Sequence, residues 1–475
     1  MLRYLLTTLM ILGVCALPAQ QNKEVWSLQD CILYARQNSI AIKRAQNAIA
    51  NAELGQQQAK HNRYPNLNSS ISGGYQFGRT IDPVSNTFNN TQIGFNSFGL
   101  NGGMLVFGGN QINNRIQLAK LDLAAAQMDA EFITDNLSLQ IANAYLGILL
   151  AEEQLEIVKK RLEQSQQQLD QTDKLIQAGA LPENDRFDLV SQVALDQQSI
   201  IDAENQVRIS YLNMQQLMLL DPQENFRVQR PTVIVPEDFN PDVLSPNEVY
   251  TTAYNNQANM KANELRMQSA EKNVDIAKGA FLPRLSIFGG ISTNFSTVAR
   301  RFSSMPGTTE QTVLLNGEPI TLEFPTNIPV AEDYPYFDQL SENLGQNVGA
   351  SISIPIYSNY SAQISTERAR LQVITQELAN QEAEQTLLTN INQAIANARA
   401  AQRSLQAAEA AVEAAEAAFE NAQNRFDVGA INSLEFSTAR LNLDQAQISL
   451  LRAKYSYIFN VKQIEFYQGK TITLN

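Results

Sequence analysis

An internal duplication constrains this chain more than any other feature of its sequence. The dipeptide Ala59-Lys60 precedes Pro65 by the same spacing that separates Ala277-Lys278 from Pro283. Two small-residue turns also correspond: Ala178-Gly179-Ala180 and Val428-Gly429-Ala430. Each copy reads as a helix, a pair of alternating strands, a very long helix, a turn and a further helix. A repeat of this length predicts one elongated body made of two similar halves rather than an enzyme.

The duplication divides the 475 residues into four expected parts. These are a signal peptide (1–20), a first structural repeat (21–220), an equatorial linker (221–245) and a second structural repeat (246–475). The strand pairs are expected at about 65–107 and about 283–356, and the C-terminal tail is expected to reach the linker. The linker contains four prolines, so it cannot form a continuous helix.

The N-terminus has the layout of a secretory signal peptide. Arg3 precedes an apolar run from Leu5 to Leu17, which is too short for a membrane helix. We expect cleavage near Ala19 or Gln20, with lipoprotein processing at Cys15 as the alternative. After cleavage only Cys31 would remain, which excludes an intramolecular disulfide.

Charge and histidine content exclude several classes of function. The net charge is -13, and no Lys/Arg cluster with interleaved aromatics is present, so nucleic acid is not an expected partner. His61 is the only histidine, which excludes a His-based triad or a multi-histidine metal site within one chain. We therefore expect neither enzymatic activity nor a cofactor.

Two regions, 108–178 and 358–428, are almost free of glycine and proline and carry apolar or small residues at alternating spacings of three and four. In the second they are Leu405, Ala408, Val412, Ala415, Phe419, Ala422 and Phe426. This spacing is typical of a coiled-coil seam. A flanking alanine seam, Ala407, Ala411, Ala414 and Ala418, would let the helix sit between two neighbours, as in a cylinder wall. An ordinary antiparallel coiled coil is the alternative.

The strand pairs alternate strictly between apolar and polar or glycine residues. In the first copy Leu67, Ile71 and Tyr75 share a face, and in the second Val348, Ala350 and Ile352 do so. Strands of about ten residues with this alternation are typical of a transmembrane β-barrel with a polar lumen. A soluble sandwich would not place strand pairs between such long helices. The strand connection at 78–97 is modest, and the one at 296–346 is long and is expected outside the cell.

Four strands cannot close a barrel, and open edges in lipid leave backbone groups unpaired at several kcal/mol each. The chain must therefore assemble. Three copies would supply twelve strands and twelve helical columns.

The helix–strand pair–helix pattern, written twice after a signal peptide, resembles the TolC family of outer-membrane efflux proteins over essentially the whole mature chain. The most specific motif is Arg425-Phe426-Asp427-Val428-Gly429-Ala430-Ile431, similar to the family's turn before the last helix. The resemblance implies a mixed α/β, mainly α homotrimer, with a 12-stranded barrel in the outer membrane and a 12-helix α-barrel in the periplasm. It also implies a periplasmic membrane-fusion adaptor and an inner-membrane pump of RND or ABC type as partners, besides outer-membrane lipid. The chain would then be the exit duct for drugs, other small molecules or proteins.

The same resemblance implies two sets of site residues. The tip turns that meet the adaptor would be Ala178, Gly179, Ala180, Val428, Gly429 and Ala430. A periplasmic constriction would be lined by Asp185, Asp188 and Glu435, whose threefold repetition would favour cations. Thr438 and Ile431 stand where the family carries an acidic and a basic residue, which puts a salt-bridge lock there in doubt.

Two other functions remain open from the sequence. A passive outer-membrane porin would have no need of the long periplasmic helices or of adaptor turns. A trimeric coiled-coil surface or structural protein would have a parallel stalk without repeated strand pairs.

Overall fold

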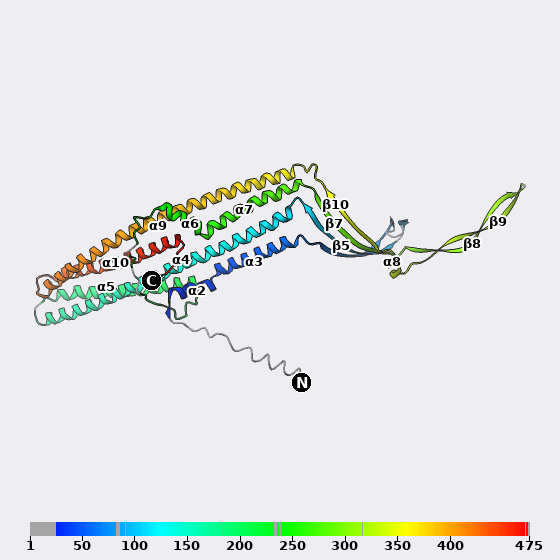
Figure 1. Ribbon diagram of the computed structural model, residues 1–475. Coiled ribbons are helices and arrows are strands. Elements are labelled where there is room, and N and C mark those ends of the chain that lie inside the picture. The colour runs from blue at the N-terminus through cyan, green and yellow to red at the C-terminus, as the bar shows by residue number, and fades with distance from the viewer. Residues whose placement is uncertain are drawn as a thin grey trace, which may run out of the picture. The chain divides into compact units, whose positions relative to one another are not determined.

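The computed structural model describes residues 25–81, 86–90, 92–179, 181–231, 235–236, 239–315, 317–470 and 472–473 (Figure 1). The chain forms two compact units. The first comprises the described residues of Met1–Ala52, Asp122–Met267 and Thr375–Asn475, and the second comprises those of Glu53–Leu121 and Gln268–Ile374. The signal peptide expected at 1–20, including Cys15, lies outside the described residues.

Long helices dominate the first unit. The longest are α4 (Gln111–Gln177) and α9 (Ser361–Asp427), each of 67 residues, whose first turns belong to the second unit. They are followed by α5 (Asn184–Met218) and α10 (Ser433–Tyr467), each of 35 residues. Among the described helices, none combines the length and the apolar character that crossing a membrane would require.

The helix expected before each strand pair is divided in two. In the first copy α2 (Leu28–Asn38) is followed by α3 (Ile40–His61), and in the second α6 (Pro246–Asn256) is followed by α7 (Ala258–Lys278). Extended backbone at Ser39 and Gln257 separates them. Neither glycine nor proline marks these breaks, which explains why the helical pattern alone did not predict them.

The core of the first unit lies where α2, α4, α5 and α10 meet. Its fully buried side chains include Ile141, Tyr145 and Ile148 of α4 and Met214 and Met218 of α5. A second cluster joins α6 to α9 and α10 through Val249, Ala253, Ile391, Ile395 and Ile464. These clusters supply most of the apolar burial that holds the helices together.

The predicted seam of α9 is largely confirmed. Leu405, Ala408, Val412 and Phe426 are buried, and Leu405 and Ala408 pack with α10 residues such as Tyr457 and Val461. The flanking alanines Ala407, Ala411, Ala414 and Ala418 are exposed in the single chain. They leave a narrow strip of small residues along α9 against which a further helix could pack closely.

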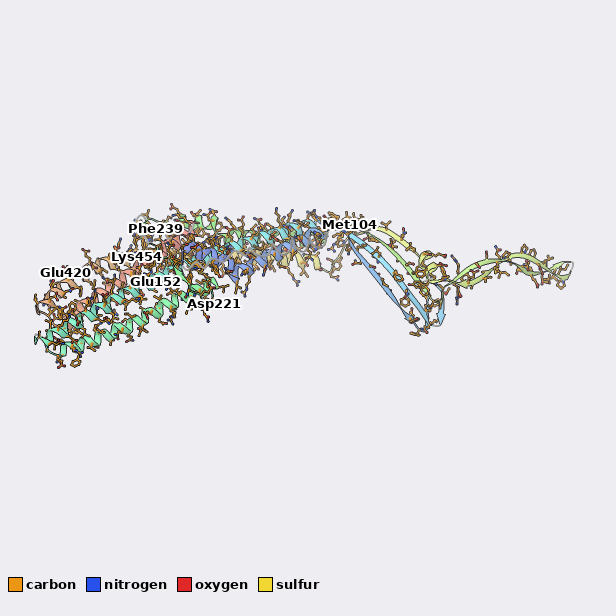
Figure 2. All side chains as sticks on the ribbon, turned by 90° about the horizontal axis from the view of Figure 1, so that it is seen from below. Met104, Glu152, Asp221, Phe239, Glu420 and Lys454 are labelled. Carbon is orange, nitrogen blue, oxygen red and sulfur yellow. The ribbon has the colours of Figure 1, made fainter. Side chains whose placement is uncertain are left out.

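The linker between the two copies binds both long helices by hydrogen bonds to its backbone. The hydroxyl of Tyr145 in α4 donates to the carbonyl of Gln229 at 2.5 Å, and that of Tyr457 in α10 donates to Phe239 at 2.8 Å. Nε of Arg399 in α9 donates to the carbonyl of Pro241 at 3.0 Å. Figure 2 labels Phe239 in this region. The only regular element of the linker's described part is β6 (Arg227–Val228), which pairs in parallel with β1 (Val25–Trp26).

The C-terminal tail reaches the same region of the first unit, as expected. Ile472 packs against the α2–α4–α5–α10 core, and its carbonyl accepts a hydrogen bond from Gln29 of α2 at 3.2 Å. Trp26 contacts Tyr34 and Phe226 edge to face, with ring centroids 5.1 and 5.8 Å away. These contacts make Trp26 a packing residue.

The second unit contains a four-stranded antiparallel sheet in the order β2-β5-β7-β10 (Figure 1). The strands are β2 (Asn66–Gln76), β5 (Ile93–Gly108), β7 (Arg284–Ser296) and β10 (Gly345–Ser353). A short ladder of β3 (Arg79–Ile81) and β4 (Phe88–Asn90) lies between β2 and β5 in sequence, and η1 (Gly279–Phe281) precedes β7. β10 ends two residues before Pro355, earlier than expected. In the described chain, β2 and β10 have no strand on their outer side.

The cross-strand register confirms the predicted alternation. Apolar residues of all four strands share one face: Leu67, Ile71, Tyr75, Phe98, Leu100, Met104, Ile287, Ile291, Val348, Ala350 and Ile352. Met104 is labelled in Figure 2. The face is uncovered: Ile71 is 74% and Val348 86% exposed. Serine, asparagine and glycine dominate the opposite face. Among its exceptions, Phe95 and Phe288 lie with their rings beside Gly74 and Gly349, and Ile93 and Leu105 share the same register.

The long connection expected at 296–346 is not an irregular loop. It contains a second antiparallel pair, β8 (Arg300–Leu315) and β9 (Glu318–Asp333), and the short helix α8 (Tyr336–Glu342). Gln339 of α8 is buried. Its side-chain oxygen accepts a hydrogen bond from the N–H of Ser296 at 2.9 Å, and its side-chain nitrogen donates to the carbonyl of Ser296 at 3.1 Å. α8 is thereby fixed to the end of β7.

Candidate functional site

The turn between α9 and α10 is a Schellman motif. Gly429 has a φ of 68°, its N–H donates to Phe426 at 2.9 Å, and the N–H of Ala430 donates to Arg425 at 2.8 Å. A left-handed backbone at this position favours glycine because it has no Cβ. Asn432 then caps α10, its side chain accepting from the N–H of Glu435 at 2.8 Å.

The turn between α4 and α5 has a related geometry. Gly179 has a φ of 75°, and its N–H donates to Ile176 at 2.9 Å. α5 begins after Glu183, which makes no side-chain capping bond. Ala180, predicted as part of this turn, lies outside the described residues.

Both turns lie at the same end of the helical unit (Figure 1). Ala178, Gly179, Val428, Gly429 and Ala430 are all exposed. A Cβ built on either glycine would meet nothing within 4 Å. Glycine is therefore required here by backbone conformation and not by crowding within the chain, and the backbone of both turns is accessible to an approaching partner.

An aromatic cluster packs next to the turn between α9 and α10. The rings of Phe426 and Phe436 stack with centroids 4.9 Å apart, and Phe419 contacts Phe436 at 5.6 Å. Near the turn between α4 and α5, an ion pair between Arg186 and Asp173, 2.9 Å apart, joins α5 to α4. Both turns are thus held by side-chain contacts between the helices that they connect.

The three predicted constriction carboxylates lie just beyond these turns. Asp185 is in the first turn of α5 and is half-buried, Asp188 follows on the same helix and is exposed, and Glu435 is exposed in the first turn of α10. Carboxylates in a first helical turn interact favourably with the helix dipole. The turns and these carboxylates are therefore gathered at one end of the unit, although on separate helices.

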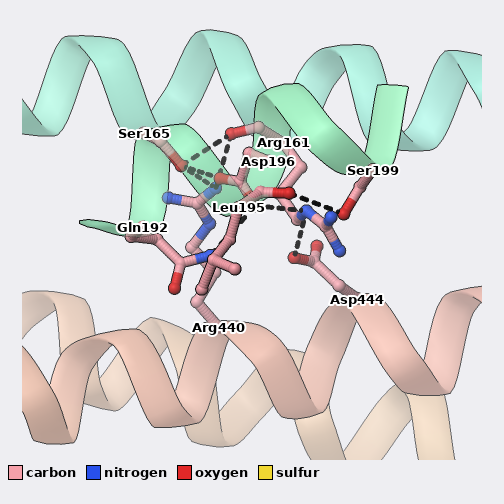
Figure 3. Close-up of polar contacts among 8 residues, drawn as sticks. All are labelled: Arg161, Ser165, Gln192, Leu195, Asp196, Ser199, Arg440 and Asp444. Atoms are coloured by element: carbon pink, nitrogen blue, oxygen red, sulfur yellow. Dashed lines mark hydrogen bonds and ion pairs between the residues drawn. The ribbon is translucent and has the colours of Figure 1, made fainter. Parts of the chain in front are cut away.

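Sequence reasoning did not find a charged cluster that joins α4, α5 and α10 (Figure 3). Nε of Arg161 lies 2.9 Å from Oδ1 of Asp196, and Nη2 of Arg440 lies 3.7 Å from Oδ2 of the same carboxylate. Asp444 is 3.9 Å from Arg161. Ser165 donates to Asp196 and accepts from Arg440 at 2.8 Å. Two arginines and two aspartates make the cluster charge-balanced.

Burial shifts the pKa values of two members of this cluster, Asp444 and Arg440. The side chain of Asp196 is 1% exposed and that of Asp444 10%. Burial raises the pKa of Asp444, Arg440 and Arg161 oppose this effect, and Asp196 adds to it. Burial also lowers the pKa of Arg440. A signal in the sequence was Ser165. It is a polar residue, like Thr172, in the three-and-four spacing that Leu155, Val158, Leu162, Leu169 and Ile176 form in α4.

No group of three or more histidine, cysteine, aspartate or glutamate side chains suited to a metal ion occurs among the described residues. His61 ends α3 and contacts the ring of Tyr64. The candidate site consists of the two exposed turns, the carboxylates beyond them and the charged cluster.

A family model described as outer membrane efflux protein matches residues 32–218 and 249–470 of the chain. Most of the described helices and strands fall within these two segments. No curated protein matches the sequence significantly.

Solved structures share the fold at low sequence identity. The CmeC outer membrane channel of Campylobacter jejuni has a TM-score of 0.75 and 16% identity, over 93% of this chain and 85% of that one. The outer membrane protein VceC of Vibrio cholerae has a TM-score of 0.72 and 16% identity, over 92% and 95%. The open state of the MtrE outer membrane channel of Neisseria gonorrhoeae has a TM-score of 0.67 and 15% identity, over 93% and 88%.

Proposed function

Because the chain belongs to the outer membrane efflux protein family, also known as the TolC family, we propose that it is the trimeric exit duct of a tripartite efflux or type I secretion system. The family places it in the outer membrane as a transport tunnel. The trimer, the adaptor, the pump and the cargo class are the proposed part.

One observation carries this proposal: the sheet β2-β5-β7-β10 has an uncovered apolar face, and no other described strand pairs with either of its two edges. Lipid contact accounts for the apolar face, since a soluble sheet of this kind would have to bury it. In lipid the free edges cost several kcal/mol for each unpaired backbone group, so they require partner strands. Pairing β2 of one copy with β10 of the next removes both edges.

Three copies form the proposed assembly. Each chain supplies four strands, so three give a 12-stranded barrel, and the fold of the solved relatives supports this closure. Each chain also supplies α4 and α9 as two full columns, with the shorter helices as two more. The matching lengths of α4 and α9, and of α5 and α10, support the proposed twofold internal repeat.

We assign the proposed domains accordingly. Residues 1–20 form a cleaved signal peptide, 21–220 and 246–475 form the two repeats, and 221–245 forms the equatorial linker. The helical body then lies in the periplasm and the sheet in the outer membrane.

Docking of a periplasmic adaptor is proposed at the two exposed turns. The accessible backbone at Gly179 and Gly429 lets the tip of a helical hairpin approach closely, which side chains at these positions would prevent. Asp185, Asp188 and Glu435 would form rings of like charge inside the tip of a trimer, favouring cations. No catalytic role is proposed.

The test is to crosslink cells, purify the tagged chain from outer-membrane extracts and identify its partners by mass spectrometry. Recovery of a periplasmic adaptor with an RND or ABC pump would support the duct. A trimer that conducts ions but is recovered without an adaptor would favour the passive porin. A trimer that does not conduct ions would overturn the proposal and favour the trimeric coiled-coil surface or structural protein.

A further inference from the structure

The ribbon formed by β8 and β9, here called the β8–β9 ribbon (Arg300–Asp333), is amphipathic, and its apolar side chains are exposed in the described chain. Its strands pair only with each other among the described strands. Residues with odd numbers in β8 and even numbers in β9 share one face, according to the register. An isolated two-stranded ribbon is marginally stable in water, so its apolar side requires an explanation.

One side, here called the inner face, carries no charged residue from Ser303 to Val313 and from Ile320 to Val330, whereas Arg301 and Glu332 share this register at the base of the ribbon. From Ser303 to Val313 and from Ile320 to Val330 it contains Met305, Val313, Ile320, Leu322, Phe324 and Ile328, which are 38–56% exposed. Gly307 adds to this face, where a Cβ would meet the side chain of Ile328. The remaining members, such as Thr309, Gln311 and Thr326, are neutral.

The other side, here called the outer face, carries the charge. Glu310 lies directly opposite Glu323, so two carboxylates are neighbours across the strands. Like charges at such a pair are destabilising unless water screens them. A contact between copies through the outer face would bring six carboxylates together, whereas a contact through the inner face between 303–313 and 320–330 would bring no charged side chains together.

Prolines restrict how the ribbon can be extended. All four prolines of the ribbon occupy outer-face positions, which have even numbers in β8 and odd numbers in β9: Pro306, Pro319, Pro325 and Pro329. Proline lacks an N–H, so it is compatible with an antiparallel ladder only where that N–H would point away from the partner strand. Three of the four lie in β9, and they remove donors from its outer edge. Continuation of the sheet from β8 of one copy to β9 of the next is therefore disfavoured.

We propose that the inner faces of the β8–β9 ribbons from three copies pack against one another around the threefold axis. This inference rests on the proposed trimer. Face-to-face packing covers the apolar side of each ribbon, keeps Glu310 and Glu323 in water, and makes no demand on the edge that the prolines block.

A second copy is the occupant that the arrangement favours. Each ribbon leaves its chain between β7 and β10, so a barrel that closes through these strands brings three identical ribbons to one end. Tethered partners meet at an effective concentration of about millimolar, so even a small neutral apolar face would associate. The base of the ribbon is held within its own chain, because Arg300 pairs with Asp333 and Arg301 pairs with Glu342 of α8.

Adjacent threonines provide a matched pair of probes. Thr309 lies on the inner face opposite Phe324, and Thr308 lies on the outer face opposite Pro325, and both are exposed. Thr309→Cys and Thr308→Cys variants are oxidised mildly in outer-membrane vesicles, and disulfide-linked dimers are counted after full denaturation. Thr309→Cys should give about tenfold more dimer than Thr308→Cys. The unmodified chain gives the baseline, because Cys31 is buried.

A native mass measurement on the same samples separates the two proposals. A trimer without preferential crosslinking at Thr309 overturns the ribbon contact and leaves the duct standing. A chain that is not trimeric overturns the proposed function itself. Crosslinking of Thr309→Cys to a different protein would also overturn the ribbon contact, because the inner face would then bind a foreign partner.

Hydrogen exchange gives an independent readout that does not need cysteine. In the trimer, amides of 303–330 should exchange about tenfold more slowly than in a Leu322→Glu variant, whose carboxylate lies on the inner face. Thr321→Glu is the control on the outer face and should leave exchange unchanged. Equal exchange in all three proteins would contradict the packing.

Discussion

The guanidinium of Arg161 lies 2.9 Å from the carboxylate of Asp196, and this buried ion pair fastens α4 to α5. Arg440 and Asp444 bring α10 to the same cluster, so helices from both sequence copies share it. Apolar packing alone allows long helices to slide, but a hydrogen-bonded charge cluster has one register. The cluster therefore fixes how the first helical hairpin is aligned with the second.

Removing one member of this cluster should be costly. An Asp196→Leu variant leaves two buried arginines facing one aspartate, and it should lose about 3–5 kcal/mol of unfolding free energy. Asp170→Asn is the matched control, because Asp170 forms an exposed pair with Lys174 and should cost less than about 1 kcal/mol. Denaturant unfolding followed by helical circular dichroism measures both. Equal effects would show that the cluster does not stabilise the helices.

The raised pKa of Asp444 gives this stability a pH dependence. A carboxyl whose pKa is higher in the folded chain binds more protons when folded, so its contribution is complete below the ordinary value of 3.8 and is lost as pH rises through the raised value. The Asp444→Asn variant should lack this component. The test is to measure the unfolding free energy of the unmodified chain and of the Asp444→Asn variant between about pH 3.5 and 7. A constant stability difference across that range would contradict the assignment.

Replacing Gly429 should impair docking without preventing insertion. A β-branched residue at a φ of 68° costs about 1–2 kcal/mol of backbone strain, and it covers the exposed backbone of the turn. We expect the Gly429→Ile variant to form trimers but to lose adaptor crosslinking and efflux of a fluorescent substrate. The Gly429→Asn variant adds a side chain that tolerates the left-handed backbone, so it separates the effect of backbone strain from the effect of covering the turn. Normal efflux by a correctly inserted Gly429→Ile variant would count against the docking assignment.

The carboxylates near the tip should set ion selectivity. In planar bilayers, the double variant Asp185→Asn with Glu435→Gln should lower the cation-to-anion permeability ratio, because each change removes a ring of three charges from the trimer. Glu420→Gln serves as the control, since Glu420 is exposed on α9 before the turn. Unchanged reversal potentials would indicate that Asp185 and Glu435 only favour the first turns of their helices.

Adjacent positions on β2 test which face of the sheet meets lipid. Ile71→Lys should cost about 2–4 kcal/mol if its side chain lies near the bilayer midplane. Ser70→Lys, on the opposite face of the same strand, should be tolerated because it meets water. The yield of folded, heat-modifiable protein in the outer membrane compares the two. Equal yields would argue against a lipid-facing side.

Strong periodic patterns in the sequence predicted the long helices, the turns and the four strands with their faces. The signals were a heptad seam in α9, glycines where the backbone is left-handed, and strict alternation along strands such as β10. They are local, so one sequence suffices to read them.

What the sequence did not predict depends on tertiary contacts. The break at Ser39 has no local breaker, and the partners of Asp196 are 35 and 244 residues away along the chain. The β8–β9 ribbon was not predicted within the long connection at 296–346, although its prolines all occupy the same register in the ladder. Such features follow from which segments meet, and a local pattern does not contain that information.

The equal lengths of α4 and α9 bear on how such a chain can evolve. Inserting one residue in either helix would advance its turn by about 1.5 Å and rotate it by about 100°, so the two turns would no longer present the same backbone at the same level. An insertion of seven residues nearly restores the orientation of the seam. The two turns then return to the same level only if the other helix receives a similar insertion. Relatives with a longer or shorter helical body should therefore differ from this chain by whole heptads, added or lost in pairs.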